Sequence, residues 1–430
     1  MIGLTLEEVR TLAPGELEAR ADEITGVQID SRRCGPGDLF VAVGAGARFG
    51  ADALDRGAAA RLVPDDPHRA LAALARAVRD RSAARVAGIT GSTGKTSTKD
   101  ILAALCRPVA RTVAAEGGHN NEIGLPLTML RIEPDTEVVV AEMGMRGVGQ
   151  IAELCAIARP DVGVVTGIGP VHLELVGTVE RVAAAKAEVV AALPPGGTAV
   201  VPAGARELEP FLDRDDIEIV RFGDGGDVRL LGFEPPELVA VVAGERVVLE
   251  VPFTARHQAE NTLAALAAYR ALGLPLARAA EGAREIAFSR WRGEEAELPG
   301  GGLLVNDAYN ANPVSMAAAI RHLRERSAGR RMVAVLGDMA ELGVSAPAFH
   351  RAIGAVAADA GVQVLVAIGP LAHEYTAGGS AIPVVRWAPG IEEGLAELDA
   401  VLEPGDAVLV KASRALGLEA VADALTGARV

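Results

Sequence analysis

The chain of 430 residues contains few cysteines and no long apolar run. Its three cysteines, Cys34, Cys106 and Cys155, lack the spacing of a metal site and indicate reduced, structural thiols. No apolar run reaches the ~18 residues that a membrane-spanning helix needs. The N-terminus also lacks a charged segment followed by an apolar core. The sequence therefore predicts a cytoplasmic protein with no membrane insertion.

Basic residues are also in deficit, because 42 Lys and Arg against 57 Asp and Glu give a net charge of −15. The acidic excess is spread along the chain, so we expect no nucleic-acid partner, since a duplex needs a basic surface. A small anionic ligand bound by local Lys and Arg side chains is compatible with this charge. Hydrophobic residues make up 50% of the chain, and its length predicts about three domains in a globular protein. We expect a monomer.

The most informative segment is residues 86–96, where an apolar strand leads into a glycine-rich turn that opens a helix. Such a turn directs backbone N–H groups and the positive end of a helix at a phosphate chain. Lys95 and the Thr96 hydroxyl complete a seat for ATP or GTP and its Mg²⁺. Ile89 stands where an eight-residue P-loop has its first glycine, and an ordinary turn is the alternative interpretation. The predicted phosphate-binding residues are Gly91, Ser92, Thr93, Gly94, Lys95, Thr96 and Ser97.

The pattern of strands and helices predicts an α/β protein with three domains. We expect a small N-terminal α/β domain over 1–82, a central P-loop domain over 83–298 and a Rossmann-like α/β domain over 299–430. In the central region, strands alternate with helices, which favours a parallel sheet covered on both faces. Segments 198–202 and 238–253 suggest an antiparallel addition to that sheet. The sequence also predicts a helix over 98–105 after the glycine-rich turn and an apolar strand over 364–368.

Three residues of the central region are candidates for metal or phosphate chemistry. Glu142 follows an apolar strand, where open α/β sheets place their ligands, and is either an Mg²⁺ ligand or a turn residue. His172 follows another apolar strand through a Gly-Pro turn and is either a second metal ligand or a structural histidine. Lys186 lies in an apolar helix and either serves the site or extends to solvent.

Together these segments resemble the Mur ligases, ATP-dependent amide-forming enzymes of peptidoglycan synthesis. Residues 90–96 resemble the family's short P-loop, and the resemblance extends over nearly the whole chain with the order of motifs preserved. It implies two Mg²⁺ sites, one through Thr96 and Glu142 and one through His172 and a carbamylated Lys186. It also implies catalytic roles for Lys95, Glu142, His172 and Lys186, and ATP contacts from His257, Asn261, Arg292, Asp307 and Tyr309.

Several segments resemble the branch of the family that joins D-alanyl-D-alanine to UDP-N-acetylmuramoyl-tripeptide. These segments are 120–126, 141–144, 307–313, 336–343 with His350, and 411–414. The Asp-Asn-Pro-Arg signature by which the preceding ligase of the family recognises diaminopimelate is absent. The resemblance implies an acyl-phosphate intermediate, a first domain that binds the UDP-sugar and a third domain that binds the amine. The implied substrate-binding residues are Ser31, Arg32, Asn120, Asn121, Asn310 and Asn312.

The chain departs from the family pattern at Gly118, at residues 48–52 around Phe49 and at Ala412, all of which concern substrate contacts. Two other functions are therefore kept as alternatives. A folylpolyglutamate synthase-like or other Mur-type ligase would share the ATP site but take another acceptor and amine. A regulatory P-loop NTPase would need a Walker-B-like Asp and an arginine finger supplied in trans, neither of which is identified in this sequence.

Overall fold

A computed structural model describes residues 1–427, so the last three residues of the predicted third domain lie outside the described part. The chain divides into two compact units, each described here by itself. The first unit contains residues 1–167, 184–253 and 260–287, and the second contains residues 168–183, 254–259 and 288 onward. The domain limits at 82/83 and 298/299 stay predictions. No helix in the described part is both long and apolar enough to cross a membrane.

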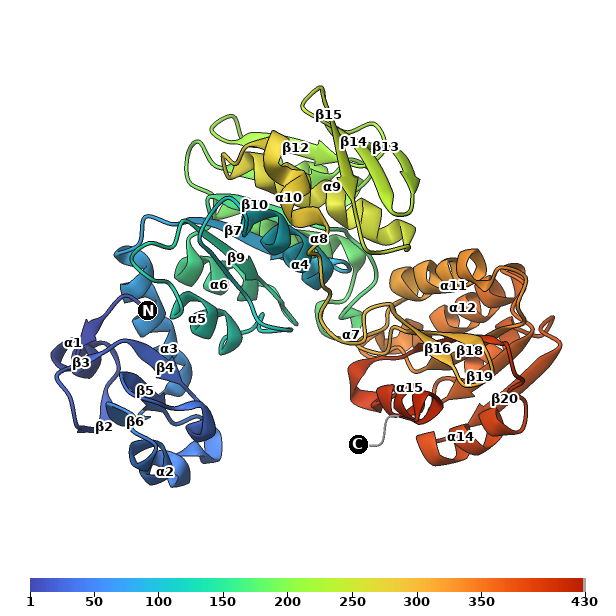
Figure 1. Cartoon of the computed structure of the whole chain (residues 1–430), viewed down its shortest axis with the longest axis horizontal. Helices are drawn as coiled ribbons and strands as arrows, with labels where there is room; N and C mark the ends of the chain where they lie inside the picture. The colour runs from blue at the N-terminus through green and yellow to red at the C-terminus, as the bar shows by residue number, and fades with distance from the viewer. Residues whose placement is uncertain (428–430) are drawn as a thin grey trace. The chain divides into compact units, whose positions relative to one another are not determined.

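The first unit begins with a four-stranded sheet and helix α3 (Pro67–Asp80) (Figure 1). Asp66 caps α3 by accepting hydrogen bonds from the backbone N–H groups of His68 and Arg69, and Pro67 occupies the first turn. The helix packs against α5 (Gly124–Met129) and α6 (Gln150–Ala158). The remaining elements are β1 (Leu4–Thr5), α1 (Leu6–Leu12), β2 (Gly15–Ala19), β3 (Glu23–Ile24), β4 (Gly26–Gln28), β5 (Asp38–Val41), α2 (Gly50–Asp55) and β6 (Ala60–Pro64).

The largest of the three sheets of this unit has nine strands in the order β15-β14-β13-β12-β11-β10-β7-β9-β8, beside the four-stranded sheet and the pair β1-β3. From β8 across the sheet to β13, neighbouring strands pair in parallel. Strand β14 pairs antiparallel with both β13 and β15. The strands are β7 (Arg85–Thr90), β8 (Thr112–Ala114), β9 (Val138–Glu142), β10 (Val162–Val165), β11 (Thr198–Pro202), β12 (Glu218–Phe222), β13 (Val228–Glu234), β14 (Glu237–Val242) and β15 (Glu245–Glu250).

The expectation that residues 198–202 belong to an antiparallel addition is wrong. Strand β11 pairs in parallel with β10 and β12. The chain leaves β10, passes through helix α8 (Val179–Ala191) and returns as β11, and a crossover helix of this kind brings the next strand back in the same direction. The helices α4 (Lys95–Cys106), α9 (Arg256–Ala271) and α10 (Ala279–Ala283) also belong to the central region.

The second unit is built on a six-stranded sheet in the order β16-β17-β21-β18-β19-β20, in which only β16 is antiparallel. Alternate residues of β18 belong to two different hydrophobic cores. Ala334 and Leu336 lie in the first core, and Val333 and Val335 lie in the second. This explains the continuous apolar strands, which are covered on both faces. The strands are β16 (Glu294–Leu298), β17 (Gly302–Asn306), β18 (Met332–Gly337), β19 (Val364–Ile368), β20 (Val384–Ala388) and β21 (Ala407–Lys411).

Helices cover both faces of this sheet, as Figure 1 shows. Met316, Ile320 and Leu323 of α11 pack into the first core, and Leu398 and Val421 pack into the second from α14 and α15. The prediction of an α/β protein with parallel sheets is therefore confirmed. The helices are α7 (Leu173–Val176), α11 (Pro313–Ser327), α12 (Ala346–Asp359), α13 (His373–Gly378), α14 (Ile391–Asp399) and α15 (Glu419–Thr426).

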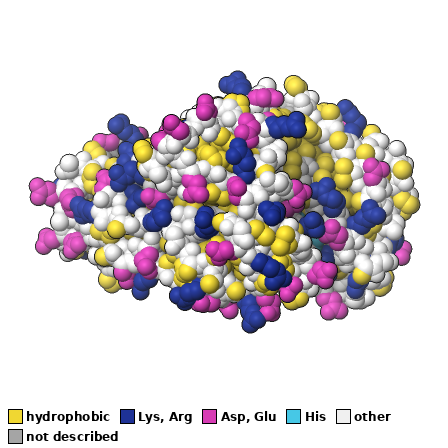
Figure 2. Space-filling view, turned by 90° about the horizontal axis from the view of Figure 1, so that it is seen from above, with side chains coloured by type: hydrophobic (Ala, Val, Ile, Leu, Met, Phe, Trp, Pro, Cys, Tyr) yellow, Lys and Arg dark blue, Asp and Glu magenta, His cyan; other side chains and the backbone are white. Residues whose placement is uncertain are grey.

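Charged side chains of both signs are interspersed on the face of the molecule shown in Figure 2. Neither the dark blue basic groups nor the magenta acidic groups gather there into one continuous patch. The acidic groups on this face are thus dispersed among basic ones.

Candidate active site

The predicted P-loop connects β7 to α4, and two of its glycines are required by the geometry. Gly91 has φ +147° and Gly94 has φ +80°, which are backbone conformations that L residues with side chains rarely adopt. A methyl group on Gly91 would lie 2.0 Å from Thr166 Oγ1, and one on Gly94 would lie 2.3 Å from Asn261 Oδ1. Asn261 of α9 therefore lies directly against the P-loop, as the predicted nucleotide contact requires.

Helix α4 begins at Lys95, three residues earlier than the predicted start at Thr98. Gly94 is its N-cap and offers no side chain to the first turn. Thr96 and Ser97 are buried in that turn, and Lys95 Nζ donates to the carbonyl oxygen of Gly91 at 2.8 Å. The positive end of a twelve-residue helix thus opens onto the glycine turn, which is the arrangement that binds a phosphate.

Glu142 is the last residue of β9, and only 1% of its surface is exposed. Its Oε1 accepts a hydrogen bond from Asn120 Nδ2 at 2.7 Å. Its Oε2 is buried and has no hydrogen-bond partner among the described residues. A buried carboxylate oxygen without a partner is costly, and carboxylate oxygens are the ligands that Mg²⁺ prefers. These observations fit the predicted Mg²⁺ ligand better than a turn residue.

Lys186 lies on α8 with 1% of its surface exposed, so it does not extend to solvent. Burial lowers the pKa of its ammonium well below the usual value, and the positive charge of Lys95 lowers it further. The amine is therefore held toward its neutral form, which is the form that reacts with CO₂. This environment fits the predicted carbamate.

His172 belongs to the second unit and precedes α7 with φ +54°. Its Nδ1 forms a hydrogen bond with Glu341 Oε2, and the backbone N–H of Glu174 donates to the carbonyl oxygen of Glu341 at 3.2 Å. Glu341 was not among the predicted site residues, although it lies in the 336–343 segment. Carboxylates that bond one nitrogen of an imidazole orient the other nitrogen toward a metal.

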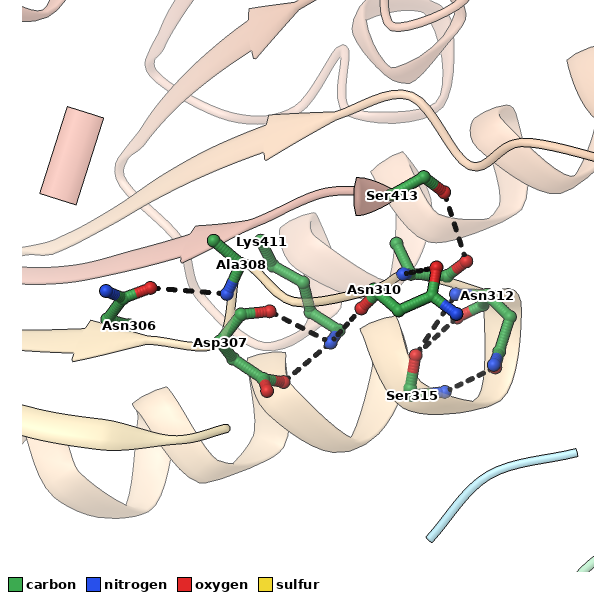
Figure 3. Close-up of polar contacts among 9 residues, drawn as sticks. Asn306, Asp307, Ala308, Asn310, Asn312, Ser315, Lys411 and Ser413 are labelled. Carbon is green, nitrogen blue, oxygen red and sulfur yellow. Dashed lines mark hydrogen bonds and ion pairs between the residues drawn. The ribbon is translucent and has the colours of Figure 1, made fainter. Parts of the chain in front are cut away.

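The loop after β17 carries the residues predicted to reach the ribose and phosphates (Figure 3). Lys411, which is 2% exposed, donates to Asp307 Oδ2 at 2.6 Å and to the carbonyl oxygen of Asn310 at 2.8 Å. Asn310 Oδ1 accepts from the N–H of Ala311 at 2.9 Å. Asn312 caps α11, because its Oδ1 accepts from the N–H of Ser315 at 3.0 Å. A buried ammonium at the end of β21 therefore holds this loop.

Aromatic and basic groups gather near this loop in the second unit. The guanidinium of Arg292 lies 4.0 Å from the ring centroid of Tyr309, a cation–π contact between two predicted ATP-binding residues. His257 packs edge-on against His322 with a centroid distance of 6.1 Å. Burial lowers the pKa of His257 to about 4, so the ring is neutral at pH 7.

The predicted substrate residues of the first unit lie in two places. Ser31 is buried, and Arg32 pairs with Asp30 at 2.8 Å. Their neighbour Arg33 contacts Glu116 at 3.6 Å and so links this segment to the loop that leads to Asn120. Asn121 Oδ1 accepts from the N–H of Gly124 at 2.9 Å near the start of α5. Asn120 and Asn121 thus have different structural roles, which the sequence did not distinguish.

Comparisons with known proteins support the predicted family. Residues 89–269 match the Mur ligase middle domain, and residues 291–414 match the Mur ligase glutamate ligase domain. A UDP-N-acetylmuramoyl-tripeptide–D-alanyl-D-alanine ligase of Mycobacterium tuberculosis is 35% identical, over 99% of this chain and 98% of the relative.

Two solved structures have the same fold over almost the entire chain. MurF from Acinetobacter baumannii has a TM-score of 0.87 at 26% identity and covers 99% of both chains. MurF ligase from Thermotoga maritima in complex with ADP has a TM-score of 0.80 at 28% identity and covers 94% of this chain and 97% of that one. The family resemblance and the three-domain α/β fold predicted from the sequence are both confirmed. The chain belongs to the Mur ligase family.

Proposed function

We propose that this chain is the ATP-dependent ligase that joins D-alanyl-D-alanine to UDP-N-acetylmuramoyl-tripeptide in peptidoglycan synthesis. Relatives carrying this name match 99% of the chain, which supports the assignment. The structural observation that carries the proposal is the buried Glu142 carboxylate, in the same unit as the P-loop, whose Oε2 has no hydrogen-bond partner within residues 1–427. A carboxylate of this kind suits an Mg²⁺ that accompanies a bound nucleoside triphosphate.

The chemistry begins from the low reactivity of a carboxylate, whose leaving group would be oxide. The terminal carboxylate of the tripeptide takes the γ-phosphoryl group of ATP, which releases ADP and forms an acyl phosphate. The amine of D-alanyl-D-alanine then attacks the acyl carbon, and a tetrahedral intermediate loses phosphate and a proton. The products are UDP-N-acetylmuramoyl-pentapeptide, ADP and phosphate. Transfer of this kind depends on positioning and on neutralising phosphate charge.

The P-loop supplies much of that positioning. Lys95 places its charge beside the β- and γ-phosphates. The backbone N–H groups of the glycine-rich loop and of the first turn of α4 donate hydrogen bonds to phosphate oxygens. Thr96 and Glu142 hold one Mg²⁺ in this proposal, and His172 with the carbamate of Lys186 holds a second. Bound Mg²⁺ would neutralise the negative charge of the phosphates and of the substrate carboxylate. A carbamate forms when the neutral amine of Lys186 adds to CO₂ and releases a proton.

The remaining predicted residues complete the proposal. His257 and Asn261 contact adenine, and Arg292, Asp307 and Tyr309 contact the ribose and phosphates. Ser31 and Arg32 bind the uridine nucleotide in residues 1–82, and Asn310 and Asn312 belong to the amine-binding domain, residues 299–430. We further propose a monomer acting in the cytoplasm, where ATP is available.

One assay tests the proposed reaction. Formation of ADP and phosphate is measured with UDP-N-acetylmuramoyl-tripeptide and ATP, with and without D-alanyl-D-alanine. We expect sustained phosphate release only when both the acceptor and the amine are present. Equal release without either substrate would favour a regulatory NTPase, and activity with a folate and glutamate would favour a folylpolyglutamate synthase.

A further inference from the structure

Asn120 contacts the candidate metal ligand from a loop that lies outside the P-loop and β9. We propose that Asn120 is a positioning residue, whose side-chain amide fixes Glu142 so that its Oε2 is presented to Mg²⁺. The inference rests on the proposed function, because it takes Glu142 as an Mg²⁺ ligand. It goes further by assigning Asn120 to the metal site, whereas the sequence predicted only a substrate contact.

The two oxygens of Glu142 have different surroundings. Oε1 receives the Asn120 Nδ2 hydrogen bond at 2.7 Å, whereas Oε2 is buried and has no partner among the described residues. An amide donor occupies one oxygen but adds no charge, so the carboxylate keeps its full attraction for a cation. A lysine or arginine in the same place would neutralise that attraction. The amide therefore orients the ligand and leaves the second oxygen for the metal.

Asn120 is itself held by its surroundings. The backbone N–H of Gly144 donates to the carbonyl oxygen of Asn120 at 2.7 Å. A methyl group on Gly144 would lie 2.7 Å from Asn120 Oδ1 and 2.8 Å from its Cγ, so the amide fits only because residue 144 has no side chain. A side chain at residue 144 would therefore displace the amide that contacts Glu142.

The loop before Asn120 is braced by a buried cation. Lys99 of α4 is 2% exposed, and its Nζ donates to the carbonyl oxygens of Ala115 at 3.0 Å and Gly117 at 3.4 Å. Glu116 is paired with Arg131 at 3.1 Å. These contacts connect the helix that follows the P-loop to the loop that orients Glu142. The phosphate seat and the metal ligand thus share one rigid support.

The neighbouring Asn121 provides a matched control. Its Oδ1 accepts from the backbone N–H groups of Ile123 and Gly124 near the start of α5. Asn121→Ala removes an asparagine from the same loop without touching Glu142. A role in loop structure alone would make Asn120→Ala and Asn121→Ala behave alike.

The test measures metal binding without the chemical step. Mn²⁺ affinity is measured by electron paramagnetic resonance on the full chain with ADP present and no sugar substrate, for the parent, Asn120→Ala, Asn121→Ala and Glu142→Gln. We expect Glu142→Gln to lose the tight Mn²⁺ site, Asn120→Ala to weaken it by about 10- to 100-fold, and Asn121→Ala to keep it. Gly144→Ala, which displaces the Asn120 amide, should weaken it as Asn120→Ala does.

Each contrary result has a separate meaning. Parent-like Mn²⁺ affinity in Glu142→Gln would overturn the metal assignment of the proposed function. A loss in Glu142→Gln with parent-like affinity in Asn120→Ala would overturn the positioning role alone. In that case, a raised KM for the UDP-sugar in Asn120→Ala would leave Asn120 as a substrate contact. Circular dichroism of each variant verifies that it is folded, and Gly144→Ala serves as the test if Asn120→Ala is not.

Discussion

Lys186 lies in surroundings that disfavour a charged ammonium. It is buried on α8, and both burial and the nearby charge of Lys95 lower its pKa. Without modification, Lys186 would be a neutral amine that brings no charge to the site. A carbamate would supply two oxygens and a negative charge. Conversion to a carbamate would therefore give this residue a function in the proposed Mg²⁺ site.

Replacing Lys186 by alanine is expected to lower kcat by about 100-fold or more, since a charge that supports the transition state is lost. Short carboxylic acids such as acetate should restore part of the activity by occupying the vacated space. Carbon-13 NMR of the parent with labelled bicarbonate should show a carbamate signal that Lys186→Ala lacks. Lys99→Met, which removes another buried lysine, should keep that signal. Parent-like activity in Lys186→Ala would make the lysine structural.

The role of a residue could be predicted from the sequence where the residues of a site lie together in one short motif. Gly91, Gly94 and Lys95 lie within six residues, so the phosphate seat is local in sequence. The contact of Asn120 with Glu142 joins a loop to the end of β9, and the contact of Glu341 with His172 joins loops that follow different strands. Such contacts depend on strand order in the sheet, and no property of the separate segments specifies them.

Among the helices and strands, the N-terminus of α11 shows how a predicted binding residue can have a structural role. Asn312 is the N-cap of α11, where it forms a capping box with Ser315, and Pro313 occupies the first turn. The same asparagine was predicted to contact substrate. Both roles are compatible only if the cap and the ligand use different atoms, because Oδ1 already accepts the Ser315 N–H.

Replacing Asn312 by alanine is expected to reduce the free energy of unfolding by about 1 kcal/mol, the usual contribution of an N-cap side chain. Urea denaturation of the parent and the variant measures this difference. Asn312→Asp keeps a capping oxygen and should recover most of the loss. If Asn312→Ala changes only the KM for the amine and leaves stability unaltered, the capping role is minor.

The limits of the strands were predicted better than the pairing between strands. The apolar segment 364–368 is β19 with the predicted limits, since a strand buried on both faces is a continuous apolar run between turn residues. The parallel pairing of β11 was not predicted, because it depends on the path of the chain through α8. The start of α4 was placed late, because Thr96 and Ser97 favour helices only weakly.

At the scale of the whole molecule, buried neutral histidines make stability depend on pH. Burial lowers the pKa of His257 to about 4 and also lowers that of His350. His350 is fully buried, accepts the Met339 N–H at Nε2 at 2.9 Å and donates from Nδ1 to the Ala346 carbonyl. A protonated ring would lose the acceptor that fixes the 336–343 segment.

The sign of the effect follows from linkage. Above pH 6.5, both histidines are mainly neutral in the folded and the unfolded chain, so they do not lower the free energy of unfolding. As the pH falls from about 6.5 toward 4, the unfolded chain takes up protons that the folded chain does not, so stability decreases. His257 alone would account for about 3 kcal/mol by pH 4. Urea unfolding between pH 7 and 5 should show this slope, and His257→Gln or His350→Gln should reduce it; an unchanged slope would contradict the assignment.

The choice of amine also belongs to this scale, because it would depend on the whole of the proposed amine-binding domain, residues 299–430. We expect kcat/KM for D-alanyl-D-alanine to exceed that for diaminopimelate, lysine or glutamate by at least about 100-fold. The third domain lacks the Asp-Asn-Pro-Arg segment that would grip a second amino-acid head group. A pocket sized for a dipeptide leaves polar groups unpaired when a single amino acid binds, at about 1 to 3 kcal/mol for each group.

The measurement uses saturating ATP and UDP-N-acetylmuramoyl-tripeptide with each amine in turn. Lys411→Met should weaken every amine reaction together, because Lys411 holds the 307–310 loop through Asp307 and Asn310 without belonging to one amine subsite. Preference among the amines should then survive in this variant while the overall rate falls. Comparable kcat/KM for diaminopimelate with a dipeptide acceptor would move the chain to another branch of its family, although the assignments at Lys95, Glu142 and Lys186 would stand, since they concern ATP and the acyl phosphate rather than the amine.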